Sequence, residues 1–354
     1  MIDISMKNID RNNMYESIIN FHQQLVDGVI IGKEAFLGEL ALAEFESVIL
    51  AGMGGSAIAG DLLQSVLLDE LKTPFSVHRN YGLPNRAGKG SLVICSSYSG
   101  NTEETLSAFQ TALERGCHIL CISTGGKLSD LAEQNNIPWL KIPAGSMMPR
   151  EALGLSFAPL LVVSGRLGLC SDYSSKVSKC ADLLKERQRQ YQFDSKKNIA
   201  MDLAEKLAGK IVVIYSGPDR FDSVALRFKG QICENAKQLA FCNVFPEFNH
   251  NELVGWELSA FFTDKFIILI LRDKDDHPQI IRRIEAVNEI FFEKKVEVIE
   301  LFSEGDSVLA RIFSLIQIAD FTSYYMALKN KIDPTPVSLI DYLKKSIASK
   351  KESQ

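Results

Sequence analysis

The sequence predicts an α/β protein of two domains, each with a parallel sheet flanked by helices. Short apolar segments that read as strands alternate with helical segments along most of the chain, and such alternation is typical of parallel sheets covered on both faces. A strand, a glycine turn and the start of a helix occur twice, at 47–63 and at 210–221. The length of 354 residues is too great for one ordinary core and suits two domains.

The composition is that of an ordinary globular protein, with 46% apolar and 23% charged residues. A net charge of −5 excludes the basic surface typical of proteins that bind nucleic acid or anionic membranes. The longest apolar stretch, around 155–164, contains a proline and is far shorter than the ~20 residues that a bilayer requires. The polar N-terminus lacks a signal-peptide core. Seven scattered cysteines without CxxC spacing predict neither disulfides nor a zinc site, so we expect a cytoplasmic protein.

The first domain is expected at 46–174, after an N-terminal helical segment at 1–45. In that segment Ile18, Phe21 and Leu25 recur at helical spacing. The expected strands of this domain are 48–51, 75–80, 92–95, 118–122 and 139–142, with helices between them.

A linking segment is expected at 175–207, where the charged run at 185–198 reads as a solvated linking helix. The second domain is expected at 208–304, and the C-terminal helices at 305–354. The expected elements after the linking segment are a strand from 211, a helix at 223–239, a strand at 266–271, a helix ending at Phe292, a strand at 296–301 and helices at 306–330 and 339–347.

The first glycine turn, Gly52 to Ala57, fits the dinucleotide-binding pattern GxGxxG/A. Such a turn directs backbone N–H groups and the positive end of a helix toward an anion, but the pattern alone is weak. The following strand ends in His78-Arg79-Asn80 rather than in the acid that an NAD site has. Arg79 could pair with a 2′-phosphate, so a cofactor of that kind stays a possible ligand of this turn. The other interpretation is a turn that serves packing and binds no ligand.

A second turn, after the strand at 92–95, is rich in hydroxyl groups. Ser96, Ser97, Ser99 and Thr102 lie within seven residues, before a helix with an acidic first turn. One of them is expected to cap the helix, but four exceed what a cap needs. Hydroxyls and helix N-terminal N–H groups together can bind a phosphate monoester. No GxxxxGK[ST] loop occurs. Two such turns on adjacent strands favour one monophosphorylated small molecule between them.

The loops GGSA and SSYSGNTEET resemble the sugar-phosphate-binding loops of the sugar isomerase (SIS) superfamily. The segments MPREALG, ICENAK, FPEFNHNE and DFTSYYMALK, in this order, are similar to those of the bifunctional phosphoglucose/phosphomannose isomerases. The resemblance covers nearly the whole chain and implies two doubly wound, flavodoxin-like SIS domains in a homodimer. It also implies interconversion of glucose 6-phosphate and mannose 6-phosphate with fructose 6-phosphate, without a metal or an organic cofactor. The implied binding residues for the sugar phosphate are Gly54, Gly55, Ser56, Ser97, Ser99 and Thr102.

An aldose–ketose isomerase opens the sugar ring, moves a proton between C2 and C1, and stabilises an enediolate. Glu234 lies between apolar stretches of a predicted helix, where a carboxylate is either paired structurally or kept as a base; the residues alone favour neither. The resemblance implies that Glu234 is the base. Glu252 is the second candidate for that role, with a hydrogen bond to His250 as its other expected task.

The resemblance also implies roles for Arg150, His250, Lys329 and Thr322. Arg150 would stabilise the enediolate with its fixed charge. His250, 16 residues after Glu234, would reach in from the neighbouring subunit and assist ring opening. Lys329 would protonate the ring oxygen, although a lysine also suits the end of a helix. Thr322, two turns earlier on the same helix face, would leave room for rotation about C2–C3, or is simply a small residue at a helix crossing.

Three alternative functions stay open at this stage. An amino-sugar phosphate isomerase or deaminase would use the same loops, although no N-terminal amidotransferase domain is expected. A sugar-phosphate sensor would need no base, so Glu234, His250 and Lys329 argue against it. An NADP oxidoreductase would use the glycine turn.

Overall fold

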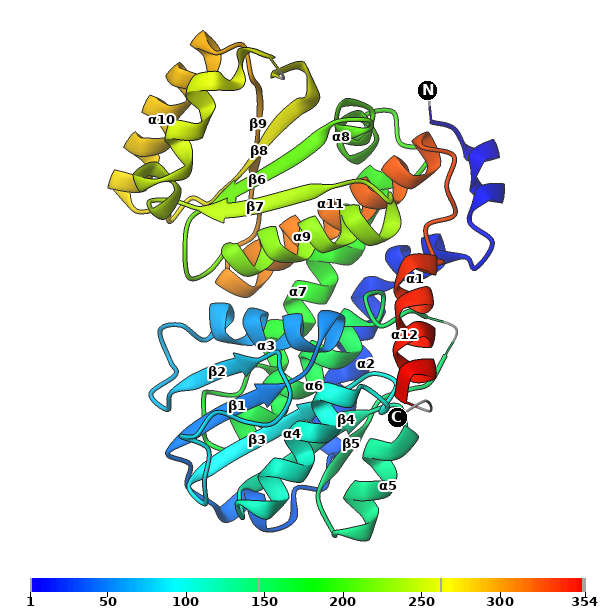
Figure 1. Cartoon of the computed structure of the whole chain (residues 1–354), viewed down its shortest axis with the longest axis vertical. Helices are drawn as coiled ribbons and strands as arrows, with labels where there is room; N and C mark the ends of the chain where they lie inside the picture. The colour runs from blue at the N-terminus through cyan, green and yellow to red at the C-terminus, as the bar shows by residue number, and fades with distance from the viewer. Residues whose placement is uncertain (1, 146, 262, 352–354) are drawn as a thin grey trace.

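Two stacked α/β units, each built on a parallel sheet, make up the molecule (Figure 1), a computed structural model that describes residues 2–145, 147–261 and 263–351. The first sheet has the order β2-β1-β3-β4-β5 and the second the order β7-β6-β8-β9. Every strand pair in both sheets is parallel. The predicted fold class, two helix-flanked parallel sheets, is confirmed.

The elements follow the predicted alternation closely. Those of the first unit are η1 (Ile4–Ile9), α1 (Met14–Ile19), α2 (Phe21–Glu34), η2 (Gly38–Leu42), β1 (Ser47–Ala51), α3 (Gly54–Val66), β2 (Phe75–His78), β3 (Ser91–Ser96), α4 (Glu103–Glu114), β4 (His118–Ser123), α5 (Gly126–Gln134), β5 (Trp139–Lys141) and α6 (Leu153–Arg166). Those that follow are α7 (Ser174–Arg187), η3 (Gln188–Tyr191), α8 (Ile199–Leu207), β6 (Ile211–Ser216), α9 (Asp222–Asn235), β7 (Ala240–Val244), η4 (Glu247–His250), η5 (Glu252–Phe261), η6 (Thr263–Lys265), β8 (Phe266–Arg272), α10 (Pro278–Glu293), β9 (Glu297–Phe302), α11 (Val308–Lys329) and α12 (Ser338–Lys351).

One hydrophobic core runs through both units. Leu50 of the first sheet and Ile214 of the second belong to the same cluster of buried side chains, together with most of α11. The opposite face of each sheet has a separate, smaller cluster. Helices α7 and α9 lie between the two sheets (Figure 1). Within the described residues, no helix is both long and apolar enough to cross a membrane.

The segment that was expected to form one solvated linking helix is instead interrupted and partly buried. Helix α7 ends at Arg187, a 3-10 turn follows, and α8 starts only at Ile199. Tyr191 and Asn198 of this segment are buried. Asn198 Nδ2 donates to the carbonyl of Tyr191 at 2.9 Å, and Asn198 Oδ1 accepts from the N–H of Met201 at 3.1 Å as the cap of α8. The prediction of one solvated helix was wrong. It rested on the many charged residues of the run and overlooked Tyr191 and Asn198, which interrupt the helix and anchor the segment to the core.

Helices α2 and α6 pack at very short distance through glycines on one side of α2. A Cβ atom at Gly28 would lie 2.7 Å from Ala158 Cβ and 2.8 Å from Pro159 Cδ. Such distances are shorter than any ordinary contact, so α6 would have to move. The N-terminal helices are therefore part of the core of the first unit.

Gly28→Ala is expected to destabilise the protein by about 1–3 kcal/mol, because overpacking of this contact outweighs the better helix propensity of alanine. Urea denaturation followed by circular dichroism measures the change. Gly230→Ala in α9 is the matched control, because a Cβ there meets nothing within 4 Å, and it should stabilise by up to about 1 kcal/mol. An equal gain in both variants would contradict the close packing.

Candidate active site

The glycine turn and the hydroxyl-rich turn lie at one edge of the first sheet. Strands β1 and β3 are neighbours and parallel, so the turns that follow them meet at the carboxyl ends of the strands. The order β2-β1-β3 makes this the point where the chain switches from one side of the sheet to the other, which is where doubly wound sheets bind ligands. Helices α3 and α4 begin directly after these turns, so their N-terminal N–H groups face the same place.

The hydroxyl groups of the two turns hold the turns together. Ser56 Oγ accepts from the backbone N–H of Tyr98 at 3.0 Å. Ser97 Oγ and Thr102 Oγ1 are 2.9 Å apart, and Ser99 Oγ accepts from the backbone at 3.3 Å. A hydroxyl that accepts from a backbone N–H keeps its own proton for donation. Ser56 and Ser99 can therefore both shape the turns and bind a phosphate oxygen.

The N-terminus of α3 lies directly against the segment that carries Arg150. A Cβ at Gly55 would be 2.8 Å from the carbonyl oxygen of Pro149, so only glycine permits this approach. Its neighbour Gly54 has a φ of +49°, a conformation that also favours glycine. The glycine turn therefore permits close contact with the backbone of the segment that carries Arg150.

Arg150 joins the two units at a buried point. It is only 4% exposed, and its Nε donates to Asn235 Oδ1 at 2.7 Å. Its Nη2 donates to the carbonyls of Pro334 and Thr335, both at 2.9 Å, and its Nη1 lies 3.5 Å from Glu234 Oε2. Burial lowers the pKa of Arg150, and the Glu234 charge opposes that shift. An arginine side chain stays protonated under such a shift.

Glu234 lies in the last turn of α9, next to the end of the helix. The helix ends at Asn235 rather than at Leu239 as expected, because Lys237 adopts a φ of +51° that terminates it. The side chain of Glu234 is 35% exposed, so the carboxylate is reachable by a small molecule while its oxygen faces Arg150.

A cavity of about 180 Å³ lies between the N-terminus of α3 and α9, and Glu234 is on its wall. Four cationic side chains and this single carboxylate line it, which favours an anionic ligand. The charged lining residues are Arg79, Arg150, Arg227, Lys229 and Glu234. A neighbouring cavity of about 150 Å³ has Asp61, Asp219 and Asp222 on its wall and no basic residue, so it does not suit a phosphate.

A buried polar network behind the cavity was missed by the sequence analysis. Arg227, Gln231 and Asn235 follow each other at intervals of four along α9 and face α11. Arg227 Nη2 donates to both oxygens of Asp320 at 2.9 and 2.8 Å, and Gln231 Nε2 donates to Asp320 Oδ1 at 2.7 Å. Asn235 Nδ2 donates to Ser323 Oγ at 2.9 Å. The recurrence of polar residues at an interval of four along α9 was the signal that could have revealed the network.

Thr322 and Lys329 lie on a different side of α11 from Asp320 and Ser323. A helix turns by about 100° per residue, so residues 322 and 329 share a face, as predicted, but that face points away from α9. Thr322 is fully buried, and its hydroxyl has no hydrogen-bond partner among the described residues. Lys329 Nζ forms an ion pair with Glu205 of α8. The structure does not bring either residue to the cavity.

His250 is exposed at the end of η4 and does not line the cavity of its own chain. Glu252 accepts hydrogen bonds from the hydroxyl of Tyr215 and, at 2.7 Å, from Asn243 Nδ2. Both partners come from strands of the second sheet, so Glu252 links these two strands instead of forming the expected hydrogen bond to His250.

All seven cysteines are free. Within the described ranges, no group of three or more His, Cys, Asp or Glu side chains is arranged to hold a metal ion.

Comparison with known proteins gives matches over nearly the whole chain. The model of the SIS domain family matches residues 41–146, and that of the bacterial phospho-glucose isomerase C-terminal SIS domain matches residues 196–347. The chain is 40% identical to a bifunctional phosphoglucose/phosphomannose isomerase of Caldicellulosiruptor bescii, over 96% of this chain and 100% of the relative. It is 34% identical to the protein of the same name from Aquifex aeolicus, over 86% and 92% of the two chains. The crystal structure of a hypothetical protein from Thermus thermophilus has the same fold, with a TM-score of 0.76 at 14% identity over 97% of this chain and 91% of that one.

Proposed function

The chain belongs to the family of the bifunctional phosphoglucose/phosphomannose isomerases, and from that premise we propose that it interconverts glucose 6-phosphate and mannose 6-phosphate with fructose 6-phosphate. The observation that carries the proposal is the pair of Glu234 and Arg150, 3.5 Å apart on the wall of a cationic cavity. A base and a fixed positive charge side by side are what enediolate chemistry requires.

In the proposed reaction, the phosphate binds at the two turns, to Gly54, Gly55, Ser56, Ser97, Ser99 and Thr102. Glu234 removes the proton from C2 of the open-chain aldose. The C–H electron pair forms the C1–C2 double bond, and the carbonyl oxygen gains negative charge that Arg150 stabilises. Glu234 then returns the proton to C1, the hydroxyl proton of O2 passes to the negatively charged O1, and the carbonyl re-forms at C2, which gives the ketose. The same carboxylate takes and returns the proton, so the proposal includes no metal and no organic cofactor. Thr322 and Lys329 are not part of it, because they do not reach the cavity.

Incubation of the purified protein with fructose 6-phosphate in the presence of a chelator tests the proposal. We expect both glucose 6-phosphate and mannose 6-phosphate as products. Release of ammonia from glucosamine 6-phosphate without isomerisation of fructose 6-phosphate would favour the amino-sugar alternative instead. Binding without turnover would favour a sensor. A cytoplasmic location stays a prediction.

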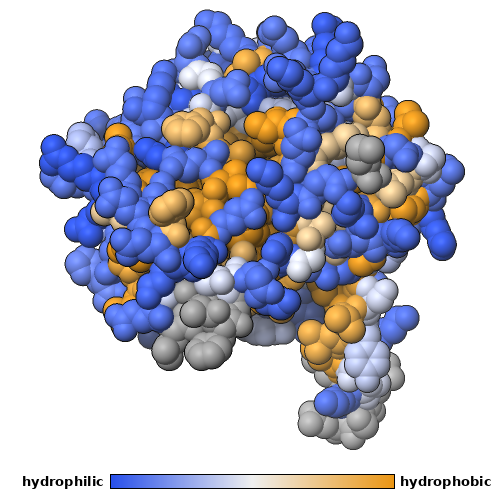
Figure 2. Space-filling view, turned by 90° about the horizontal axis from the view of Figure 1, so that it is seen from above, coloured by the Kyte–Doolittle hydropathy of each residue, from blue (hydrophilic) through white to orange (hydrophobic). Residues whose placement is uncertain are grey.

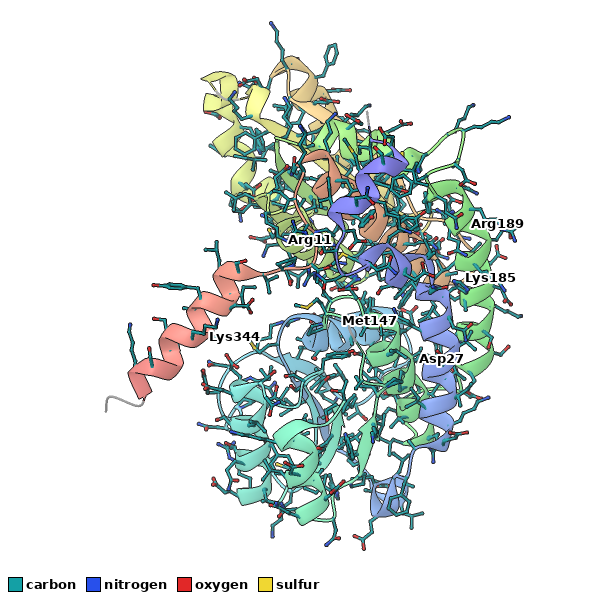
Figure 3. All side chains as sticks on the ribbon, turned by 90° about the vertical axis from the view of Figure 1, so that its right-hand side faces the viewer. Arg11, Asp27, Met147, Lys185, Arg189 and Lys344 are labelled. Carbon is teal, nitrogen blue, oxygen red and sulfur yellow. The ribbon has the colours of Figure 1, made fainter. Side chains whose placement is uncertain are left out.

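We further propose a homodimer, and helix α12 supports it. The helix projects from the body of the molecule, with Lys344 on it (Figure 3). Its apolar side chains Leu339, Tyr342 and Leu343 are 85%, 73% and 57% exposed, and hydrophobic residues are visible on the projection at the lower edge of Figure 2. An isolated helix of 14 residues is marginal in water. It contains four lysines and one aspartate in a chain of net charge −5, so a second copy is a complementary partner for it.

If His250 completes the cavity of a neighbouring subunit, two inactive variants should complement each other. A mixture of Glu234→Gln and His250→Ala subunits is expected to recover up to about a quarter of wild-type activity after subunit exchange, because one mixed site regains both groups. Mass spectrometry of the intact dimers verifies that exchange has occurred. Exchange without recovered activity would place His250 outside the partner's site.

A further inference from the structure

We propose that Lys237 is a positioning residue for the isomerisation: its ammonium group fastens the turn at 333–335 to the end of α9 and thereby holds Arg150 beside Glu234. The inference deepens the proposed function and rests on it. Lys237 itself does not line the cavity, so it acts through Arg150 and Glu234 rather than on the substrate.

The hydrogen bonds of Lys237 reach both sides of this junction. Nζ donates to the carbonyl of Glu234 at 2.7 Å, to that of Pro334 at 2.8 Å and to that of Asp333 at 3.1 Å. The carbonyl of Asn235 is a fourth acceptor at 3.4 Å, so the three protons of the ammonium group are all used. The carbonyl of Pro334 also accepts from Arg150 Nη2 at 2.9 Å. Lys237 and Arg150 therefore donate to the same turn, Lys237 from the end of α9 and Arg150 from the first unit.

The backbone of Lys237 indicates that its side chain is needed. The residue follows the end of α9 with a φ of +51°, a position where glycine is the usual residue because a Cβ is strained there. Lys295 has the same position after α10, with a φ of +58°, and lies away from the cavity. The two lysines thus have the same backbone strain, but only Lys237 contacts residues of the active site.

The protonation of Lys237 is expected to make the activity depend on pH. The pKa of Lys237 is lowered to about 8, first by burial and then by the Arg150 charge, while Asp333 and Glu234 oppose the shift. These are the charged groups that face it from the first unit, the turn and α9. A neutral amine places a lone pair among the carbonyl oxygens and loses one hydrogen bond, so Arg150 is held less precisely and kcat should decline above pH about 8. Because the unfolded chain has the higher pKa, global stability instead rises with pH between about 8 and 10.5 at this group.

Lys237→Gly is the sharpest test, with Lys295→Gly as the matched control. Glycine relieves the strain in both variants, which in Lys237→Gly offsets part of the cost of the lost hydrogen bonds, so both should stay folded at the assay temperature. We expect kcat to fall about 10- to 100-fold in Lys237→Gly alone, with little change in KM, because the reacting groups are displaced. The alkaline decline of wild-type kcat near pH 8 should disappear in Lys237→Gly. Lys237→Arg keeps the charge and should restore part of kcat, with the decline moved to higher pH.

Hydrogen exchange of the backbone at 331–336 gives a readout that does not depend on activity. Exchange there should be faster in Lys237→Gly than in wild type or Lys295→Gly. This result would stand even if the chain proved not to be an isomerase. A kcat and an exchange rate in Lys237→Gly equal to those of Lys295→Gly would overturn the inference and leave Lys237 as an ordinary helix-terminal residue.

Discussion

Replacing Glu234 by glutamine is expected to lower kcat by about 10²- to 10⁴-fold in both directions of the reaction, because the amide cannot take the proton from C2. Binding of fructose 6-phosphate should survive, since the two turns proposed to bind its phosphate are untouched. The folded state should change little in stability, because the side chain is partly exposed and the amide oxygen can still accept from Arg150. Steady-state kinetics and calorimetric titration with the substrate measure the two effects separately.

Glu252→Gln is the matched control for that experiment. Glu252 accepts from Tyr215 and Asn243, so its amide variant leaves one donor of the second sheet poorly paired and should cost about 1 kcal/mol of stability. Its kcat should stay near that of wild type. An inactive Glu252→Gln beside a fully active Glu234→Gln would mean that the base is assigned to the wrong carboxylate.

Arg150→Gln is expected to lower kcat by about 10²- to 10³-fold, because the enediolate loses its positive partner. The same variant should lose about 3 kcal/mol in the free energy of unfolding, since the buried acceptors on Asn235, Pro334 and Thr335 lose their donors. Kinetics at a temperature where the variant is fully folded separate the two losses from each other.

Arg79→Gln provides the contrast. Arg79 also lines the cavity, but its side chain is 36% exposed and pairs with Asp61. Removing it should raise KM for the phosphorylated sugar, leave kcat nearly unchanged, and affect stability by less than about 1 kcal/mol. A fall in kcat as large as that of Arg150→Gln would show that general positive charge, rather than the position of Arg150, supports the reaction.

The order of strands and helices and the positions of the two turns could be predicted because their signals are local. Apolar runs such as 266–271, and the glycines and hydroxyls that follow β1 and β3, specify strands, turns and helix starts from neighbouring residues alone. Parallel pairing of adjacent strands then places the two turns together. The roles of Glu234 and Arg150 came from resemblance to a family, because the pattern of residues left Glu234 open between a structural and a chemical task.

What only the tertiary structure decided depends on contacts between distant parts of the chain. Helical periodicity places Thr322 and Lys329 on one face of α11, but the packing of α9 against Asp320 and Ser323 determines that this face points away from the cavity. In the same way, no local pattern reveals that Arg150 and Lys237 meet at the carbonyl of Pro334, 184 residues after the arginine. Periodicity specifies which residues share a side of a helix; burial of the most complementary surfaces, summed over the whole fold, decides what that side contacts.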